Sequence, residues 1–291
     1  MRLGIITPIV SRNPRFDHPD WEMEAGIDEI AGIVKAADQL GYDFCTFPEH
    51  IAVPLEAARA RGGTYWSPLP VMGYLAGATS RIRLATYIVV LGYHHPMAVV
   101  KEYGTLDRIC GGRLILGVGV GSLKEEFDLL GAGFDGRGAR ADDALRAIRA
   151  CFGQLEPAYH GSVFDIEGFL VEPCGVQAHL PVWVGGRSRR SLRRALELGD
   201  GWAPFRVPAT DAAAMLRDAP VPRPASFEVV LRPEPPLDPG RDPGRVREEL
   251  DLHEKAGATA LALRFEHRSL AHYLDQLAAM QEIAATSDSA G

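Results

Sequence analysis

The sequence lacks three features that would each assign the protein to a class. No stretch approaches the roughly 20 consecutive apolar residues of a membrane-spanning helix. The four cysteines, Cys45, Cys110, Cys151 and Cys174, include no C-x-x-C pair, which excludes the common zinc-knuckle and thioredoxin-like motifs. Acidic residues outnumber basic residues by 38 to 31, and the net charge of −7 argues against a surface for nucleic acid or anionic membranes.

The N-terminal segment also lacks the pattern of a secretory signal. Met1–Val10 contains one short apolar run and turns polar at Ser11, which is too short for the apolar core of a signal peptide. Cys45 lies inside an apolar run, where a buried reduced thiol is expected. We therefore expect a cytoplasmic protein without a membrane or nucleic-acid partner.

The sequence instead contains an alternation of short apolar runs and longer segments with helical periodicity. The expected strands are Leu3–Thr7, Phe44–Phe47, Ile82–Leu91, Leu114–Val118, Pro181–Val184, Gly201–Phe205, Phe227–Leu231 and Ala260–Phe265. The expected helices are Asp28–Leu40, Ser67–Thr79, Pro96–Ile109, Gly138–Phe152, Ser188–Leu198, Val246–Ala256 and Leu270–Ala285. About eight such units in 291 residues predict an α/β protein with the (β/α)8 TIM-barrel fold.

No break in composition marks a domain boundary. We therefore expect one barrel domain over residues 1–285, followed by a flexible polar tail at 286–291. Tyr159–Val171 alternates apolar and polar residues and is expected to form a small hairpin insertion. The proline-rich segment Asp218–Gly244 is interpreted as loops of the same domain around one strand.

A glycine-dense run, Gly117–Gly121, follows the fourth expected strand. Glycine permits a backbone to approach a ligand closely. The run lacks the third glycine of the dinucleotide fingerprint, because Lys124 stands near that place, so it predicts no nicotinamide site. A glycine-rich strand end fits the C-terminal face of a β/α barrel, where ligands bind.

Histidines follow the second and third expected strands. His50 comes directly after Pro48 and Glu49, at a strand end where barrel enzymes carry catalytic groups, and imidazole exchanges protons near neutral pH. A structural histidine that caps the loop is the alternative. His94 and His95 are adjacent and diverge in an extended segment, and no third ligand stands at helical spacing, so we predict no metal site.

Glu49 could also pair with Glu125 or Glu126 as the two carboxylates of a glycoside hydrolase. The favoured alternative is that the latter two form the acidic first turn of a helix. The tryptophans could form a sugar platform, but Trp183 and Trp202 lie in expected strands and are assigned to the core.

A second glycine pair, Gly185 and Gly186, ends the fifth expected strand, and Arg187 and Ser188 then open a helix. The N-terminus of a helix offers free N–H groups and the positive end of its dipole to an anion. We interpret this segment as a phosphate site. The alternative is a capped helix with a solvated basic face, since arginines continue along it.

Taken together in chain order, these segments resemble the bacterial luciferase-like family, and within it the F420-dependent oxidoreductases. The pieces that carry the resemblance are Phe47–His50, Arg81–Ile88, His95–Pro96, Lys101, Thr105–Asp107, Gly112–Gly119, Glu126–Phe127, Pro181–Gly186 and Gly199–Trp202. Each piece is short, but their order is specific and covers most of residues 1–205. The final third is similar only in its alternation of strands and helices.

The resemblance implies a luciferase-like barrel with a deazaflavin or flavin at its top face. It implies that His50 and Glu49 are catalytic, with His50 beside the reactive ring carbon and Glu49 in the place of an aspartate that the F420 group often has. It also implies a non-proline cis peptide at Tyr87–Ile88, in a bulge that backs the ring. The cofactor-binding residues it implies are Thr86, Tyr87, Ile88, Gly117, Gly119, Val184, Gly185, Gly186, Arg187 and Ser188. Ser122–Leu123 departs from the Trp or Ala-Glu of many relatives.

The function implied by the resemblance is hydride transfer between coenzyme F420 and an organic substrate. The first alternative is an FMN-dependent monooxygenase that uses oxygen and receives reduced flavin from a partner reductase. The second is a non-catalytic flavin-binding protein. We expect a homodimer that takes a small-molecule substrate, with a flavin or F420 reductase as a further partner. The loops Ile51–Ser67 and Asp218–Gly244 are expected to select the substrate.

Overall fold

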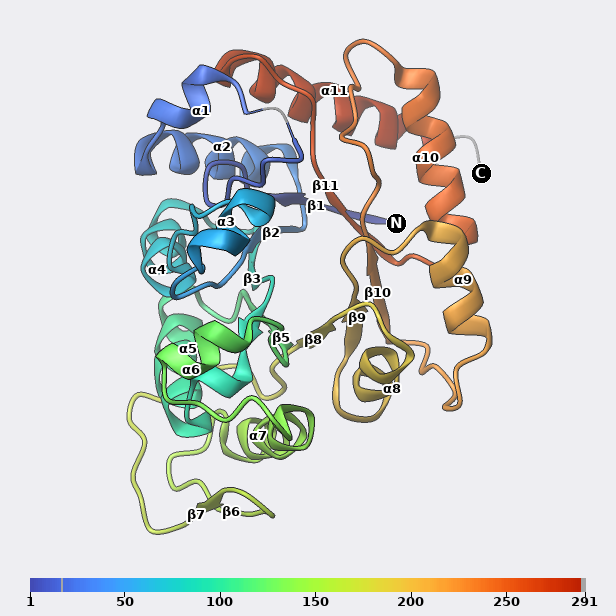
Figure 1. Ribbon diagram of the computed structural model, residues 1–291. Helices are drawn as coiled ribbons and strands as arrows, with labels where there is room; N and C mark the ends of the chain where they lie inside the picture. Colours follow the sequence, from blue (N-terminus) through green and yellow to red (C-terminus); the bar gives the residue numbers. More distant parts are fainter. Residues whose placement is uncertain (17, 289–291) are drawn as a thin grey trace.

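Eight parallel strands close into a barrel in the computed structural model, which describes residues 1–16 and 18–288 (Figure 1). The barrel strands are β1 (Arg2–Ile6), β2 (Phe44–Phe47), β3 (Arg83–Thr86), β5 (Leu114–Gly119), β8 (Val182–Gly185), β9 (Gly201–Ala203), β10 (Glu228–Leu231) and β11 (Ala260–Leu263). They pair in chain order, and the parallel pairing of β1 with β11 closes the ring. The TIM barrel expected from the alternation is confirmed.

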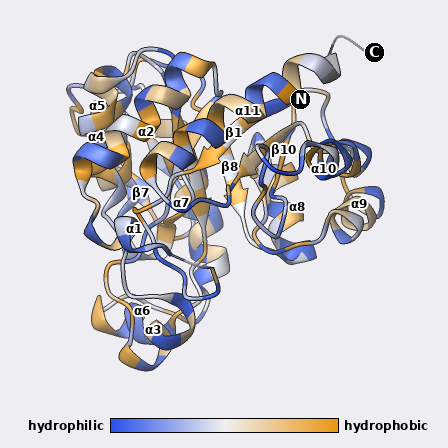
Figure 2. Ribbon diagram, turned by 90° about the horizontal axis from the view of Figure 1, so that it is seen from above, coloured by the Kyte–Doolittle hydropathy of each residue, from blue (hydrophilic) through white to orange (hydrophobic). Residues whose placement is uncertain are grey.

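Helices surround the strands, as the view from above shows (Figure 2). They are α1 (Asp20–Glu24), α2 (Ile27–Leu40), α3 (Leu55–Arg61), α4 (Pro68–Ala78), α5 (Pro96–Ile109), α6 (Lys124–Leu129), α7 (Arg137–Cys151), α8 (Arg189–Leu198), α9 (Ala209–Arg217), α10 (Pro243–Lys255) and α11 (Leu270–Asp288), with a 3₁₀ turn η1 at Leu91–Tyr93. Among the described residues, none of these helices combines the length and the apolar composition needed to cross a membrane.

Three expectations about secondary structure need correction. The expected strand Ile82–Leu91 is broken into β3 and β4 (Val89–Val90), and the Tyr87–Ile88 peptide between them is cis, as the resemblance implies. The sequence reading missed helix α9, and also the short helices α1 and α3. Helix α11 reaches Asp288, so the first three residues of the expected tail are helical, while 289–291 lie outside the described residues.

The expected hairpin insertion is present but short. Strands β6 (Tyr159–His160) and β7 (Asp165–Ile166) pair antiparallel beyond α7 and away from the barrel (Figure 1). The buried carboxylate of Asp143 in α7 accepts N–H groups of Val163 and Phe164 at 3.0 Å each, which fixes the hairpin turn. The insertion therefore has its own local anchor and leaves the barrel closed.

The barrel interior is filled by buried apolar side chains from all eight barrel strands. Phe44 and Trp183 are fully buried there and meet edge to face, with ring centroids 4.9 Å apart. Gly4 makes room for them, because a Cβ at that position would lie 2.4 Å from the Phe44 ring. Burial of a large apolar side chain contributes roughly 1.5–3 kcal/mol, so this plug stabilises the barrel below its C-terminal mouth.

Glycines in β5 and β8 make room for the bulge between β3 and β4. A Cβ on Gly117 would lie 1.9 Å from the carbonyl oxygen of Thr86. Cβ atoms on Gly119 and Gly185 would lie 2.6 Å and 2.8 Å from the side chain of Ile88. The glycines expected to face a ligand thus admit the protein's own chain, and direct contact of Gly117, Gly119 and Gly185 with a cofactor stays a prediction.

Two Gly→Ala substitutions separate this steric role from the general effect of glycine. Gly117→Ala should destabilise the fold by about 1–3 kcal/mol, the range for overpacking a core. Gly32→Ala, at an exposed position of α2 with open space around it, should stabilise by about 0.5–1 kcal/mol because alanine favours the helix. Urea unfolding measures both. A Gly117→Ala protein as stable as the wild type would show that the bulge does not need the glycine.

Candidate active site

His50 lies at the C-terminal end of the barrel, three residues after β2, and is held by a carboxylate from α6. Its Nδ1 lies 2.8 Å from Oε2 of Glu126, whose side chain is fully buried, whereas the His50 side chain is 19% exposed. The ring of Tyr65 meets the imidazole edge to face at 4.5 Å between centroids. The predicted catalytic histidine is therefore both fixed and accessible.

Glu126 accepts four hydrogen bonds. Its Oε1 takes the N–H groups of Ile51 and Ala52 at 2.6 Å and 3.1 Å, directly after His50. Its Oε2 takes His50 and the Tyr93 hydroxyl, the latter at 2.6 Å. Burial alone would raise the pKa of Glu126, but these hydrogen bonds outweigh it and hold the pKa below its ordinary value. The residue is thus a carboxylate at neutral pH.

The charge of Glu126 decides the tautomer of His50. An ionised carboxylate can only accept, so Nδ1 of His50 carries the proton in this contact. Nε2 has no hydrogen-bond partner among the described residues. The ring can therefore take up or release a proton at Nε2, while Glu126 stabilises the cation that forms.

Glu49, predicted as the second catalytic residue, points to a different network. Its Oε2 accepts the N–H of Val90 at 2.8 Å and its Oε1 meets Nε2 of His94 at 2.9 Å. The hydrogen bond to Glu49 raises the pKa of His94 despite burial. Both oxygens of Glu49 are engaged inside the protein. The geometry therefore favours a role in positioning β4 and gives no support to a catalytic role.

The cis bulge presents Tyr87 and Ile88 at the barrel mouth, where both are partly exposed. The Tyr87 hydroxyl donates to the carbonyl of Pro204 at 2.7 Å, which ties the bulge to the end of β9. Thr86 and Val184 are buried in the barrel wall, and the Thr86 hydroxyl donates to the carbonyl of Gly117 at 2.8 Å. Thr86 and Val184 therefore support the barrel wall. Contact of either residue with a cofactor stays a prediction.

The segment after β8 forms the N-terminus of α8, as expected. Gly186 has a φ of 110°, in the region that glycine adopts readily, and its carbonyl accepts Trp202 Nε1 at 3.1 Å. The Ser188 hydroxyl caps the helix by accepting the N–H of Ser191 at 3.2 Å. Arg187 and Ser188 are exposed, and no ion pair occupies Arg187 among the described residues. The geometry shows a capped helix start, and anion binding at this segment stays a prediction.

The structure supports none of the other sites considered from the sequence, which are a metal site, a carboxylate dyad and a sugar platform. Among the described residues, no group of three or more His, Cys, Asp or Glu side chains is placed to hold a metal ion. His95 caps α5 by accepting the N–H of Met97. Glu49 and Glu126 each hold their own network, and Trp183 and Trp202 are fully buried, so neither a carboxylate dyad nor a sugar platform forms.

The sequence reading missed the role of Glu126 and Tyr93. Glu126 was interpreted as part of an acidic helix turn, and it lies 76 residues from the histidine that it holds. Its neighbour Glu125 is exposed, whereas Glu126 and Phe127 are buried. A carboxylate on the apolar face of a short helix was the available signal, because buried carboxylates need donors.

Comparison with known proteins gives one family match. A family model described as luciferase-like monooxygenase matches residues 1–221. The uncharacterized protein Rv0940c of Mycobacterium tuberculosis (strain ATCC 25618 / H37Rv) is 30% identical over 182 residues, which cover 58% of this chain and 62% of that protein. The chain thus spans less than two thirds of the length of the first curated relatives that it matches.

Two solved structures share the fold at low sequence identity. Monooxygenase RslO1 from Streptomyces bottropensis has a TM-score of 0.73 and 20% identity, covering 99% of this chain and all of its own. An F420-dependent secondary alcohol dehydrogenase, solved with an F420-acetone adduct, has a TM-score of 0.71 and 14% identity, covering 97% of each chain. Identities this low show the fold alone.

Glu126→Gln should destabilise the protein at pH 7 by about 1–3 kcal/mol, because the new amide group faces hydrogen-bond donors. The folded-state pKa of Glu126 lies below its ordinary value of 4.5, so the stabilisation is present above pH 4.5 and is lost as the pH falls through the folded value. Urea unfolding from pH 7 down to pH 3 should show the difference from wild type shrinking. Glu125→Gln, the exposed neighbour, is the control and should change little. An equal loss at every pH would contradict the assignment.

Proposed function

The chain belongs to the luciferase-like monooxygenase family, and from that membership we propose that it is an oxidoreductase that transfers a hydride between coenzyme F420 and an organic substrate. The observation that carries the proposal is the pairing of His50 with Glu126 at the same barrel end as the cis Tyr87–Ile88 bulge. A fixed proton carrier beside a rigid apolar support suits hydride transfer to or from a planar ring.

The residues present fit a cofactor with a flat ring and a phosphate. The ends of β2, β3 and β8 open on the same face, because all barrel strands run parallel. The bulge offers the partly exposed Tyr87 and Ile88 as an apolar support. The start of α8 offers N–H groups, Arg187 and Ser188 to a phosphate. Binding of F420 to these residues is our proposal.

When bound, the deazaflavin would supply the hydride chemistry, and the protein would supply position and charge. His50 would hold or move the proton at Nε2 that the substrate oxygen gains or loses. Glu126 would keep Nδ1 protonated and stabilise the imidazolium. Glu49 and Tyr93 would position the surrounding turn. We further propose a cytoplasmic homodimer, to which an F420 reductase or flavin reductase supplies the reduced cofactor.

An FMN-dependent monooxygenase is the second candidate. It is supported by the description of the family and by the monooxygenase from Streptomyces bottropensis, whose structure covers nearly the whole chain. The same phosphate site and bulge serve FMN. The F420 proposal is supported by the order of the sequence motifs and by the dehydrogenase of the same fold that binds F420.

Cofactor titration of the purified protein tests the proposal. F420 should bind tightly and FMN weakly, as followed by the optical spectrum of each cofactor. Arg187→Ala should weaken F420 binding by about 1–3 kcal/mol, the range for a hydrogen bond to a charged group. It should leave a deazaflavin without the phosphate unaffected. Arg193→Ala, six residues further along the chain and inside α8, is the control.

The outcomes of this titration are distinct. Tight FMN binding with weak F420 binding would overturn the proposal in favour of the monooxygenase. Binding without turnover across a panel of alcohols, aldehydes and enones would favour a non-catalytic flavin-binding protein. Equal weakening of both deazaflavins by Arg187→Ala would remove the phosphate site from Gly185–Ser188.

His50→Asn should lower turnover at least 10²-fold while cofactor affinity changes little, because proton transfer contributes about 10²–10⁴-fold. His160→Asn, on the exposed β6–β7 hairpin, should leave turnover unchanged. Steady-state rates and cofactor dissociation constants measure the two effects. Turnover of His50→Asn equal to that of the control would exclude the histidine from the reaction.

A further inference from the structure

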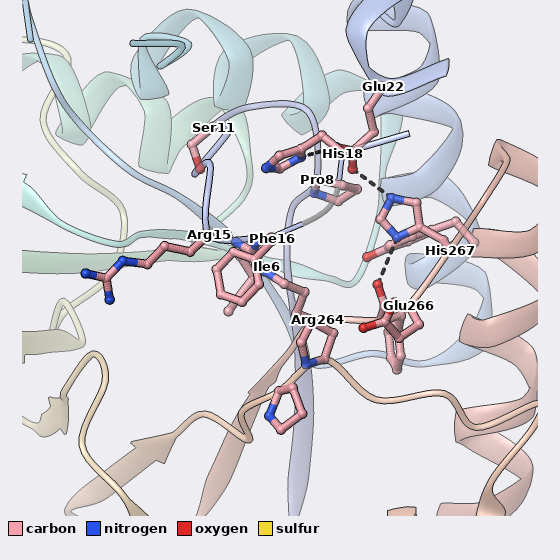
Figure 3. Close-up of a pocket in the computed structure, with 14 residues that line it drawn as sticks. Ile6, Pro8, Ser11, Arg15, Phe16, His18, Glu22, Arg264, Glu266 and His267 are labelled. Atoms are coloured by element: carbon pink, nitrogen blue, oxygen red, sulfur yellow. Dashed lines mark hydrogen bonds and ion pairs between the residues drawn. The ribbon is translucent and has the colours of Figure 1, made fainter. Parts of the chain in front are cut away.

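A cavity of about 250 Å³ lies at the barrel mouth, among the segments that follow β1, β10 and β11 (Figure 3). Ile6, Phe16 and Phe265 form apolar walls, and several charged side chains border it. None of its lining residues was predicted as a site residue from the sequence. Its volume lies just below the roughly 300–1,000 Å³ of pockets for drug-sized ligands, so it suits a small organic molecule.

Arg264, the first residue after β11, lines this cavity, and its guanidinium has no salt-bridge partner among the described residues. Its guanidinium carbon lies 4.0 Å from the centre of the Phe16 ring. Its side chain makes no hydrogen bond with any of the described residues, and the carboxylates of Glu22 and Glu234 act on it only through charge at longer range. Burial, and next the positive charge of Arg232, lower the pKa of Arg264 to about 10, so it remains a cation at pH 7. A largely buried, unpaired cation costs stability unless an anion joins it.

The neighbouring carboxylate of Glu22 is already engaged by two histidines. His18 and His267 contact its two oxygens at 2.5 Å and 2.8 Å (Figure 3). The other nitrogen of each ring meets a backbone carbonyl, that of Asn13 at 2.9 Å and that of Phe265 at 2.8 Å. The hydrogen bond with Glu22 raises the pKa of His18. Both oxygens of Glu22 are thus engaged by histidines, and Glu22 forms no salt bridge with Arg264 among the described residues.

The remaining charged groups around Arg264 balance one another. Arg232 is paired with Glu234 at 3.0 Å. Arg15 and Glu266 also border the cavity, but both are exposed and carry opposite charges. Tyr273 lines the cavity as well, and its buried hydroxyl has no hydrogen-bond partner among the described residues. The cavity thus presents the guanidinium of Arg264, which has no direct partner, and an unused hydroxyl donor.

The cavity adjoins the bulge on which the proposed reaction depends. Ile6 lines the cavity and also belongs to the barrel-interior cluster against which Tyr87 packs. Arg232 is close to both: its guanidinium carbon is 5.6 Å from the Phe16 ring centre, and its charge opposes the burial that raises the pKa of Tyr87 to about 12. A molecule in the cavity therefore lies beside the residues proposed to support the ring.

We infer that this cavity receives the organic substrate of the proposed reaction, and that Arg264 binds a carboxylate on that substrate. The planar guanidinium matches a carboxylate with two parallel hydrogen bonds, and the apolar walls hold the rest of a small molecule. The identity of the ligand as substrate rests on the proposed function. The carboxylate site itself stands on the geometry of the cavity and is testable without cofactor.

The first test needs no ligand. Arg264→Met removes the charge and keeps an unbranched apolar stem, so the melting temperature of the ligand-free protein should rise by about 2–4 °C. Arg268→Met, at an exposed position shortly before α11, is the matched control and should change little. A lower melting temperature for Arg264→Met would show that the arginine stabilises the ligand-free fold and would overturn the inference.

The second test uses carboxylic acids from propionate to hexanoate, with benzoate, each compared with its neutral amide. Calorimetric titration of the cofactor-free protein should show at least one acid that binds more than tenfold tighter than its amide. Arg264→Met should abolish this preference, and Arg264→Lys should weaken it because the ammonium lacks the planar fork. Arg268→Met should retain it.

The inference fails if no acid in the series is preferred over its amide, or if Arg264→Met keeps the preference. These outcomes are separate from those of the cofactor titration. An Arg264-dependent acid preference in a protein that binds neither F420 nor FMN would leave the carboxylate site and remove the proposed reaction. Tight F420 binding without acid preference would leave the proposed reaction and remove the carboxylate site.

Discussion

The close approach of the β3–β4 bulge to glycines 117, 119 and 185 is the constraint on which the rest of the site depends. The carbonyl of Thr86 and the side chain of Ile88 occupy the space that Cβ atoms of these residues would fill. In that space the third strand stops at Thr86, passes through the cis Tyr87–Ile88 peptide and resumes at Val89. The bulge then brings Tyr87 over the packed barrel interior, which places an apolar support at the mouth.

Two buried carboxylates then fix the turn that follows the bulge. Glu49 holds Val90 and His94, and Glu126 holds Tyr93 together with His50. The turn η1 lies between these contacts, so it joins the two networks mechanically. The position of His50 therefore depends on α6 and on η1 as much as on its own strand. Interactions of this kind are not additive, since removal of one donor changes the environment of the others.

The repeated strands and helices could be predicted from the sequence because each has a local periodicity of apolar residues. The break after Thr86 was not readable from hydrophobicity, since Ile82–Leu91 is apolar on both sides of the bulge, and only the family resemblance indicated it. Helix α9 was missed because its residues, rich in alanine, bury only Ala209 and Ala212 and so leave a weak apolar pattern.

The site contacts were harder to predict because their partners are distant in sequence. Glu126 contacts His50, which lies 76 residues away in the sequence, and Glu22 contacts His267, which lies 245 residues away. Single histidines and carboxylates carry no periodic signal, so their pairing follows only from the closure of the barrel. Glu49 shows the converse case. Its place next to His50 in the chain suggested a shared role, but successive residues in an extended segment point in different directions.

The closure of the barrel also brings together segments inside and outside the family match. His50, Tyr87 and Glu126 lie in the part that the family model matches, which ends at residue 221. Arg264, Arg232 and Tyr273 come from the segments that follow. The cavity is thus completed by segments that lie outside the family match. Exchange of residues in the loops after β10 and β11 can therefore reshape the cavity without altering the contacts between His50 and Glu126, because those contacts come from other parts of the chain.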